Sequence, residues 1–221
     1  ANTPATISLA TLGTSASVGF PRFIDTLRQE APKVMLISQQ IDDKWEDRLR
    51  SGSLDFAIVA KKKFDDDMVT QRLMSIKPVL YMRNDHPLAK VEHVTLEQRR
   101  QYQHMAVYFP NFESTKEEIR KLFASFGILS NVPFLSTNLI VCLETLRETD
   151  MLMIGSDRLM DAKLVSENFV SKPLDDLINL KIDALSLVPH IRTKNFPLHS
   201  FLAKMIVKSF SETPPRLTYS V

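Results

Sequence analysis

The side chains that most often carry metal or acid–base chemistry are dispersed along this chain. Its five histidines are His86, His93, His104, His190 and His199. No two of them lie three or four positions apart, the spacing at which a helix presents two ligands to one metal ion. The chain also lacks a GxxxxGK or GxGxxG phosphate loop and a GxSxG nucleophile turn. The sequence therefore predicts no catalytic group, no metal site and no other cofactor.

The one cysteine, Cys142, lies in the apolar run LIVCL. Free cysteine behaves as a small apolar side chain and is commonly buried, so we predict a core residue and not a nucleophile. A single cysteine also allows no internal disulfide, which fits a reducing compartment.

Composition is typical of a globular protein that does not itself hold nucleic acid. Hydrophobic residues make up 44% and charged residues 24% of the 221 positions, which suits one large domain or two small lobes. The formal net charge is +2, whereas a DNA-binding domain normally shows a clear basic excess. No apolar run approaches the ~20 residues that span a bilayer. The first residues, ANTPATISLATLG, lack the basic start and long apolar centre of a signal peptide.

Apolar periodicity alternates between strands and helices along the first sixty residues. Residues 6–11 alternate as a strand does, and 18–31 carry apolar side chains at helical spacing. The continuously apolar run 54–60 indicates a strand covered on both faces. With a strand at 34–39 and a helix at 42–52, this order predicts a mostly parallel α/β sheet.

The same alternation returns in the middle of the chain. We predict further strands and helices at 95–102 (helix), 105–109 (strand), 114–127 (helix), 132–136 (strand), 137–149 (helix), 151–155 (strand) and 156–165 (helix). Extended segments at 70–87 and 169–174 would cross between two lobes, and a strand at 182–191 with a helix at 196–210 would complete the first lobe.

The predicted fold class is therefore α/β, with two Rossmann-like lobes joined by two crossover strands. Lobe I would comprise residues 1–77 and 172–210, lobe II would be inserted at 78–171, and 211–221 would form a tail. Ligands of open α/β sheets bind beyond the carboxyl ends of the strands. The turns that follow the strands are therefore the places to look for binding residues.

Two such turns are rich in hydroxyl groups, one in each predicted lobe. They are Gly13-Thr14-Ser15 and Ser136-Thr137-Asn138. Each can be a simple helix cap, or it can present hydroxyls and helix N–H groups to a carboxylate.

The charged run after residue 60 has the same two interpretations. Ala60 and Lys61 follow the third strand, so Lys61 either contacts an anionic ligand or lies in a solvated loop with the charges beyond it. Tyr108 and Phe109 end another strand and would form an apolar wall of the site or part of the core.

Four segments resemble the effector-binding domain of LysR-type transcriptional regulators. LRSGSLDFAIV is similar to the family's L-x-x-G-x-L/I-D-h-A-I segment, and VLYMRNDHPLAK to its h-h-x-R-x-D-H-P-L-A crossing. FPRFIDTLRQEAP resembles the family's first helix, and LETLRETDMLMIGSDRL its late strand–helix unit. These segments span nearly the whole chain in the family's order, and the DHPLA motif is the most specific of them.

The resemblance implies a fold like that of the type II periplasmic binding proteins, with a small-molecule effector between two lobes. It also implies a dimer or tetramer, in which helices 18–31 and 115–126 would pair through side chains such as Phe20 and Phe123 unless these are core residues. Carried over position by position, the effector site would comprise Thr11, Gly13, Thr14, Ser15, Gln40, Ala60, Lys61, Phe109, Ser136, Thr137 and Asn138.

The chain also departs from the family pattern. Where many members have a G-x-G-h-a-h-h-P stretch, it reads TDMLMIGS. The family's helix-turn-helix is not among these residues, so we expect an isolated regulatory fragment of a cytoplasmic regulator. Promoter DNA would be contacted through that absent N-terminal part, and RNA polymerase is a further partner that the resemblance allows.

Two other functions remain open on the same fold. The first is an exported solute-binding receptor of a transporter, which an upstream signal peptide would reveal. The second is an enzyme, which would need an acid–base or covalent group that the sequence does not offer.

Overall fold

The computed structural model describes residues 4–11, 19–60, 63–108, 117, 120–121, 123–125, 127–128, 131–174 and 184–211. The chain divides into two compact units. The described residues up to Ile76 and from 184 onward form the first unit, and those from Lys77 to Leu174 form the second. Among the described helices, none has both the length and the apolar character needed to cross a bilayer.

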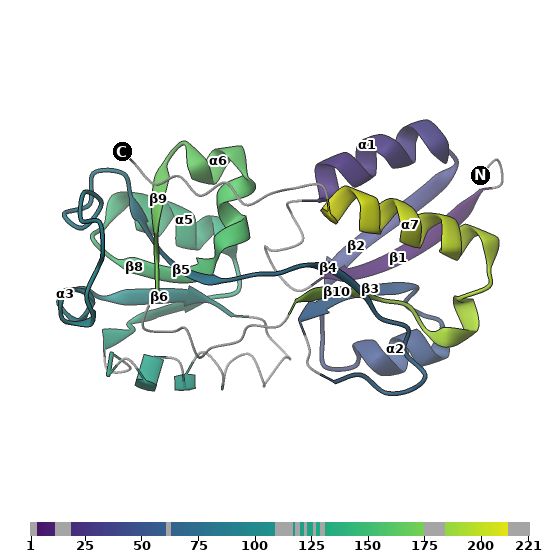
Figure 1. Ribbon diagram of the computed structural model, residues 1–221, viewed down its shortest axis with the longest axis horizontal. Helices are drawn as coiled ribbons and strands as arrows, with labels where there is room; N and C mark the ends of the chain where they lie inside the picture. The colour runs from purple at the N-terminus through teal and green to yellow at the C-terminus, as the bar shows by residue number, and fades with distance from the viewer. Residues whose placement is uncertain are drawn as a thin grey trace. The chain divides into compact units, whose positions relative to one another are not determined.

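The first unit is built on a five-stranded sheet (Figure 1). Its strands are β1 (Ala5–Thr11), β2 (Val34–Gln40), β3 (Phe56–Ala60), β4 (Gln71–Met74) and β10 (Leu185–Val188). The spatial order is β2-β1-β3-β10-β4. Strands β1, β2 and β3 run parallel, whereas β10 is antiparallel to both of its neighbours.

The helices of the first unit are α1 (Phe20–Glu30), α2 (Trp45–Ser51) and α7 (Pro197–Ser211), with a short 3-10 turn η5 (Ile191–Thr193). Helices α1 and α7 contact one another and cover one face of the sheet, while α2 lies over the other face (Figure 1). Phe23 and Leu27, four positions apart in α1, are both buried because they fall on one face of that helix. Gly52 ends α2 in the left-handed conformation at φ 81°, where glycine carries no side-chain penalty.

The second unit contains the other five strands. They are β5 (Pro78–Arg83), β6 (His104–Val107), β7 (Phe134–Ser136), β8 (Leu152–Ser156) and β9 (Phe169–Pro173), in the order β7-β6-β8-β5-β9. Strands β6, β7 and β8 run parallel, and β5 is antiparallel to β8 and β9. Its helices are α3 (Leu96–Arg100), α5 (Leu139–Glu148), α6 (Lys163–Ser166) and the 3-10 turn η3 (Asp157–Asp161).

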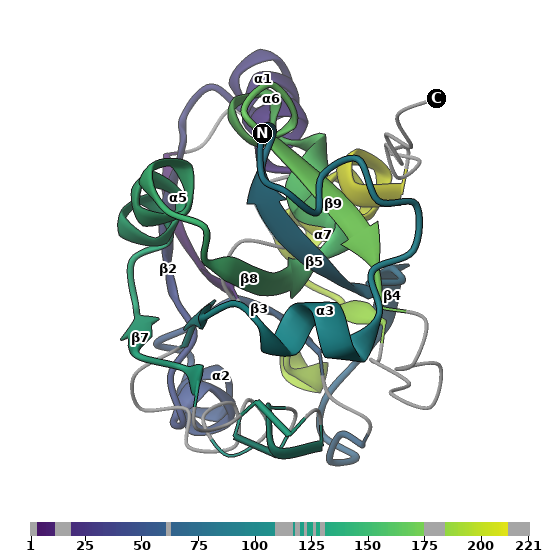
Figure 2. The ribbon, with the colours of Figure 1, turned by 90° about the vertical axis from the view of Figure 1, so that its left-hand side faces the viewer.

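Each face of the second sheet is covered by its own apolar cluster. Helices α5 and α6 pack on the face that carries Tyr81 and Met153, and α3 lies toward the face that carries Leu80 and Leu152 (Figure 2). Cys142, with 0% exposure, belongs to the first of these clusters, as predicted.

The DHPLA motif has a structural role in the second unit. The ring of His86, which is 2% exposed, accepts a hydrogen bond from the Leu88 N–H at Nδ1, so its Nε2 must donate to the Asp150 carbonyl at 3.1 Å. Asp85 pairs with Arg83, which also binds the Asp150 carboxylate. The motif therefore fixes the turn after β5 to the loop before β8.

The α/β class is confirmed, and three details differ from the sequence-based expectations. The sheets are mixed because strands next to the crossings run antiparallel to their neighbours. The segment 169–174, expected as the return crossing, instead forms β9 of the second sheet, so Lys172 and Pro173 belong to the second unit. The single helix expected at 156–165 is η3 followed by the short α6, since Ala162 between them is extended.

Candidate functional site at the carboxyl ends of the strands

Three predicted ligand residues of the first unit lie together at one edge of its sheet. Thr11 and Gln40 are partners in the β1–β2 ladder and end their strands side by side. Thr11 also lies opposite Ile58 of β3, so Ala60 extends two residues further along the same edge. Thr11 is buried, Ala60 half-buried and Gln40 exposed. The parallel ladders thus bring these positions together, as the carboxyl-end rule predicts.

The turn after β7 occupies the corresponding edge of the second sheet. Asn138 caps α5, since its Oδ1 accepts hydrogen bonds from the N–H groups of Ile140 and Val141 at 2.9 and 3.4 Å. The Ser136 hydroxyl accepts from the Asn138 N–H at 3.1 Å. The capping interpretation of this turn is therefore correct for the Asn138 oxygen.

The capping bonds leave donors that face no protein partner. Within the described part of the chain, no hydrogen bond involves the Thr137 hydroxyl or the Asn138 side-chain nitrogen, and both residues are exposed. These groups lie at the N-terminus of α5, a ten-residue helix whose aligned peptide dipoles favour an anion there. The turn can therefore cap the helix and still bind a carboxylate.

Tyr108 adds an aromatic side chain to the same edge. Its N–H donates to the Ser136 carbonyl at 2.9 Å, which continues the β6–β7 pairing one residue past β6, and its side chain is half-buried. Below this turn, burial raises the pKa of the Cys142 thiol, so that side chain stays protonated in the core.

Five predicted site residues lie outside the described residues. They are Gly13, Thr14, Ser15, Lys61 and Phe109.

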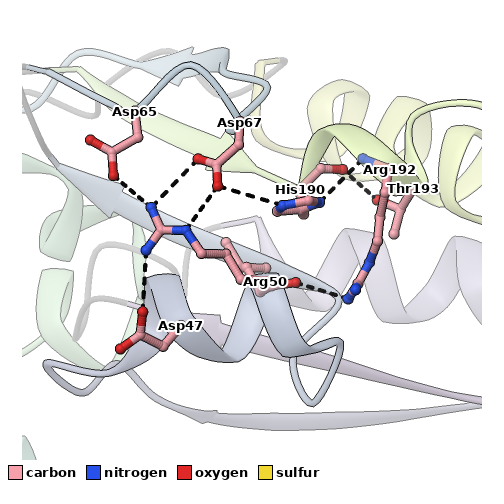
Figure 3. A network of polar contacts seen from close by, with 8 residues as sticks. Asp47, Arg50, Asp65, Asp67, His190, Arg192 and Thr193 are labelled. Atoms are coloured by element: carbon pink, nitrogen blue, oxygen red, sulfur yellow. Dashed lines mark hydrogen bonds and ion pairs between the residues drawn. The ribbon is translucent and has the colours of Figure 1, made fainter.

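The aspartates beyond Lys61 do not belong to the carboxyl-end edge. Asp65 and Asp67 bind Arg50 of α2 at 2.5 and 2.8 Å, and Asp47 binds the same guanidinium at 3.2 Å (Figure 3). His190 lies 3.6 Å from Asp67, and the Ile191 N–H donates to the Asp67 carbonyl. These contacts join Asp65 and Asp67 to α2 and η5, which gives the two aspartates a structural role.

Asp55, at the start of β3, also has a structural explanation. Its carboxylate accepts hydrogen bonds from the Ser8 N–H and hydroxyl and from His199 Nε2, each at 2.8 Å. Burial by itself would raise the pKa of Asp55, but the hydrogen bonds from His199 and Ser8 outweigh it and hold that pKa below its usual value. The residue joins β1, β3 and α7 and lies away from the carboxyl ends.

Sequence reasoning missed two residues at the carboxyl edge of the second sheet, Ser156 and Asp157. Ser156 is the last residue of β8 and Asp157 follows it, where the end of β8 lies between the start of β5 and the end of β6. The signal is present in the sequence, because a serine ends this strand as Ser136 ends β7. The apolar pattern instead predicts that the pair belongs to a helix.

No metal centre emerges from this arrangement. Among the residues that the structure describes, no three His, Cys, Asp or Glu side chains gather as a metal ion would require.

Two mixed α/β sheets, with polar groups at the carboxyl ends of their parallel strands, define an α/β domain of the periplasmic-binding-protein-like class. The family model of the LysR substrate binding domain matches residues 2–197. The chain therefore belongs to the family of regulatory, ligand-binding domains of LysR-type transcriptional regulators, which are regulators and not enzymes.

Solved structures agree on the fold. The regulatory domain of MexT, a transcriptional activator in Pseudomonas aeruginosa, matches with a TM-score of 0.73 at 16% identity, covering 95% of this chain and 100% of that one. HinK, a LysR family transcriptional regulator from the same organism, gives 0.70 at 16% identity, over 94% and 70% of the two chains.

Two curated relatives match parts of the chain. The HTH-type transcriptional regulator CysB of Haemophilus influenzae is 30% identical over 134 residues, which is 60% of this chain and 41% of that protein. The uncharacterized HTH-type regulator YybE of Bacillus subtilis is 32% identical over 93 residues, 42% and 32% of the two. The matches thus span less than half the length of either relative.

Proposed function

We propose that this chain senses a small organic anion for a cytoplasmic LysR-type regulator and passes the bound state to promoter DNA through other parts of that regulator. The observation that carries the proposal is the set of residues at the carboxyl ends of the strands: the polar Thr11 and Gln40 beside Ala60 in the first unit, and the polar Ser136 to Asn138 in the second. The proposed preference for an anionic ligand rests on the N-terminus of α5 and on the side-chain donors of Thr137 and Asn138, which have no hydrogen-bond partner among the described residues. Lys61, Phe109 and residues 13–15 extend the proposed site.

The effector would act by favouring one arrangement of the units over another. A ligand shifts such an equilibrium only as far as its affinities for the two states differ. An effector that engages both edges has such a difference, because only some arrangements allow both contacts. The change would reach DNA through self-association of the regulator.

Self-association is supported by apolar side chains that remain exposed. On the edge strand β2 these are Met35 (61%) and Ile37 (47%), and on α5 they are Ile140 (65%) and Val141 (44%). The side chains named for the expected helix pairing are engaged within the chain. Phe20 is half-buried and packs edge-on against Phe23 and Phe210, and Phe123 is 1% exposed. We therefore place the proposed contact on β2 and α5.

Thermal unfolding with a panel of metabolites tests the proposed sensing. Each carboxylic acid is paired with its uncharged amide, so that the panel separates charge from shape. A true effector at a hundredfold excess over its Kd adds about 2.7 kcal/mol of stability, which raises Tm by several degrees in a chain of this size. If amides stabilise as well as acids do, the proposed anionic preference is wrong.

The variant Thr137→Val locates the site. It keeps the side-chain volume and the α5 cap but removes a hydroxyl that has no hydrogen-bond partner among the described residues. We expect effector affinity to fall about fivefold to tenfold, with the ligand-free Tm unchanged. Thr26→Val is the matched control, because the Thr26 hydroxyl binds only the Arg22 carbonyl on α1. Unchanged affinity in Thr137→Val would remove the second-unit turn from the site.

A further inference from the structure

A three-residue link, Ser75 to Lys77, joins β4 of the first sheet to β5 of the second. The residue at its centre, Ile76, packs against the apolar core of the first unit. On the same side, the Arg72 guanidinium donates to the Ser75 hydroxyl at 2.6 Å. The link is therefore fixed to the first unit as far as Ile76.

The other end of the link is held by Asp157, through both its side chain and its backbone N–H. The Lys77 N–H donates to Asp157 Oδ1 at 2.9 Å, and the Asp157 N–H donates to the Lys77 carbonyl at 2.8 Å. Asp157 is 5% exposed, so water competes little for its carboxylate. Both backbone groups of Lys77 are thus paired with one residue at the carboxyl end of β8.

The end of β8 is itself held in place by β5. The Tyr81 hydroxyl donates to the Ser156 carbonyl at 2.6 Å, and the Tyr81 ring lies across Gly155, where a Cβ atom would come within 3.1 Å of it. Burial, and after it the charge of Asp157, raises the pKa of Tyr81, so this hydroxyl keeps the proton that it donates. Asp157 therefore holds Lys77 from a rigid position.

Pro78 restricts the link further. Its ring fixes its own φ, and its Cδ disfavours helical conformations of the preceding residue, Lys77. Because Ile76 is packed and Lys77 is hydrogen-bonded, the backbone of the link keeps little conformational freedom. What remains is rotation about the bonds on either side of the Ile76–Lys77 peptide.

We propose that Asp157 is a positioning residue that holds Lys77 and confines the first crossing between the units to rotation about the bonds flanking the Ile76–Lys77 peptide. This inference rests on the proposed function in one respect: the rotation that Asp157 guides would be the response to the effector. Its geometry is independent of any ligand.

Amide hydrogen exchange at Lys77 tests the hold directly. In Asp157→Ala the Lys77 N–H loses its acceptor, and we expect its exchange to accelerate by about tenfold. Asp157→Asn keeps an oxygen acceptor and should restore slow exchange. Asp150→Ala is the matched control, because it removes an aspartate from the opposite end of the same sheet. Equal Lys77 exchange in the wild type and Asp157→Ala would overturn the proposal.

Spin-label distances test the consequence for the two units. Spin labels are attached to cysteines introduced at two exposed positions, Lys204→Cys in α7 and Lys163→Cys in α6. The native Cys142 is buried and so is shielded from labelling. The labelled 221-residue chain is diluted with unlabelled chain, so that only distances within one chain are measured. Asp157→Ala should broaden the distance distribution, and Asp157→Asn and Asp150→Ala should leave its width unchanged. A distribution of wild-type width in Asp157→Ala would also overturn the proposal.

A second variant keeps the test decisive if Asp157→Ala does not fold. Pro78→Ala leaves Asp157 intact but frees Lys77 from the proline restriction, so it should broaden the same distribution. An unchanged width in Pro78→Ala would then refute the confined link. None of these measurements uses an effector, so failure of the anion panel and failure of this proposal are separate outcomes.

Discussion

Ser8 and Asp55 are joined by a reciprocal set of hydrogen bonds between β1 and the start of β3. The Asp55 carboxylate accepts from the Ser8 N–H and hydroxyl, each at 2.8 Å, and the Asp55 N–H lies 3.2 Å from the Ser8 carbonyl. The carboxylate thus takes the place of a backbone acceptor in the ladder. It extends the pairing of two parallel strands by one residue.

Replacing Asp55 should destabilise the first unit in a pH-dependent manner. Asp55→Ala leaves the partners on Ser8 and His199 without an acceptor, and we expect a loss of about 1–3 kcal/mol in the free energy of unfolding at pH 7. Because the folded-state pKa of Asp55 is lowered, this stabilisation is present above the ordinary aspartate pKa and is lost as the pH falls through the folded value. Urea unfolding of wild type and variant at pH 7 and pH 3 measures the difference.

The control for this prediction is Asp25→Ala on α1. Asp25 is exposed, and among the described residues its side chain binds Gln29 within its own helix. Its removal should change stability by less than about 0.5 kcal/mol. If Asp25→Ala and Asp55→Ala behave alike, Asp55 does not have the role described here.

The burial of His104 predicts a second pH dependence of stability, at higher pH than that of Asp55. Its ring is completely buried beside Phe123, and burial lowers its pKa to about 4. An unfolded chain binds the proton near pH 6.5, so stability should fall as the pH drops from about 6.5 to about 4 and change no further below that. The full effect is at most about 3.5 kcal/mol, since one pKa unit corresponds to about 1.4 kcal/mol.

His104→Phe should remove this dependence. We measure how much unfolding free energy the wild type and the variant each lose between pH 7 and pH 4.5. The difference between the two losses is the contribution of His104, because both proteins carry the same carboxylates. His93→Phe is the control, because His93 is an exposed histidine of the same unit. Equal slopes in wild type and His104→Phe would show that His104 does not titrate in this manner.

Gly19 predicts a steric effect at the packing of α1 on α7. A Cβ atom at this position would lie 2.6 Å from Cε2 of Phe210, a ring that is 0% exposed. Gly19→Ala should therefore cost about 1–3 kcal/mol of unfolding free energy, as overpacking of a core does. The double variant Gly19→Ala/Phe210→Leu should lose less than the sum of the single variants. Strict additivity would contradict the contact.

Charges on β2 should weaken the proposed self-association. Glutamate at Met35 or Ile37 meets water in the single chain but would be desolvated in an interface. We expect the dissociation constant for self-association, measured by sedimentation equilibrium, to rise about tenfold or more. Leu164→Glu is the control, since Leu164 is 65% exposed but lies on α6. An equal effect of Leu164→Glu would argue against β2 as the contact.

Periodicity predicted the elements well where local signals determine them. Gly52 ends α2, and Thr95 caps α3 with the reciprocal Gln98 bonds of a capping box. The run from 54 was expected to be a strand throughout, but β3 begins at Phe56 because the Asp55 side chain takes over the pairing. The strand pattern placed Ala60 at a carboxyl end, the family resemblance supplied Thr11 and Gln40, and the strand ladders bring the three to one edge.

Contacts between distant segments were not predictable in this way. Nothing near Asp157 in the sequence reveals that its carboxylate binds Lys77, eighty positions away. That contact depends on β8 lying beside β5, an order set by the packing of the whole sheet. Likewise, the exposed apolar side chains of β2 became apparent only when it proved to be an edge strand.

The two units differ in how their segments are distributed along the sequence, and this difference affects folding during synthesis. The described residues of the second unit all fall within one range of the sequence, Lys77 to Leu174. In the first sheet, by contrast, the described strand β4 pairs with β10 and packs against α7, both of which are made more than a hundred residues later. On a ribosome, the second unit can therefore fold as soon as it emerges. The first must wait, with the apolar residues of β4 uncovered, until nearly the whole chain has been synthesised.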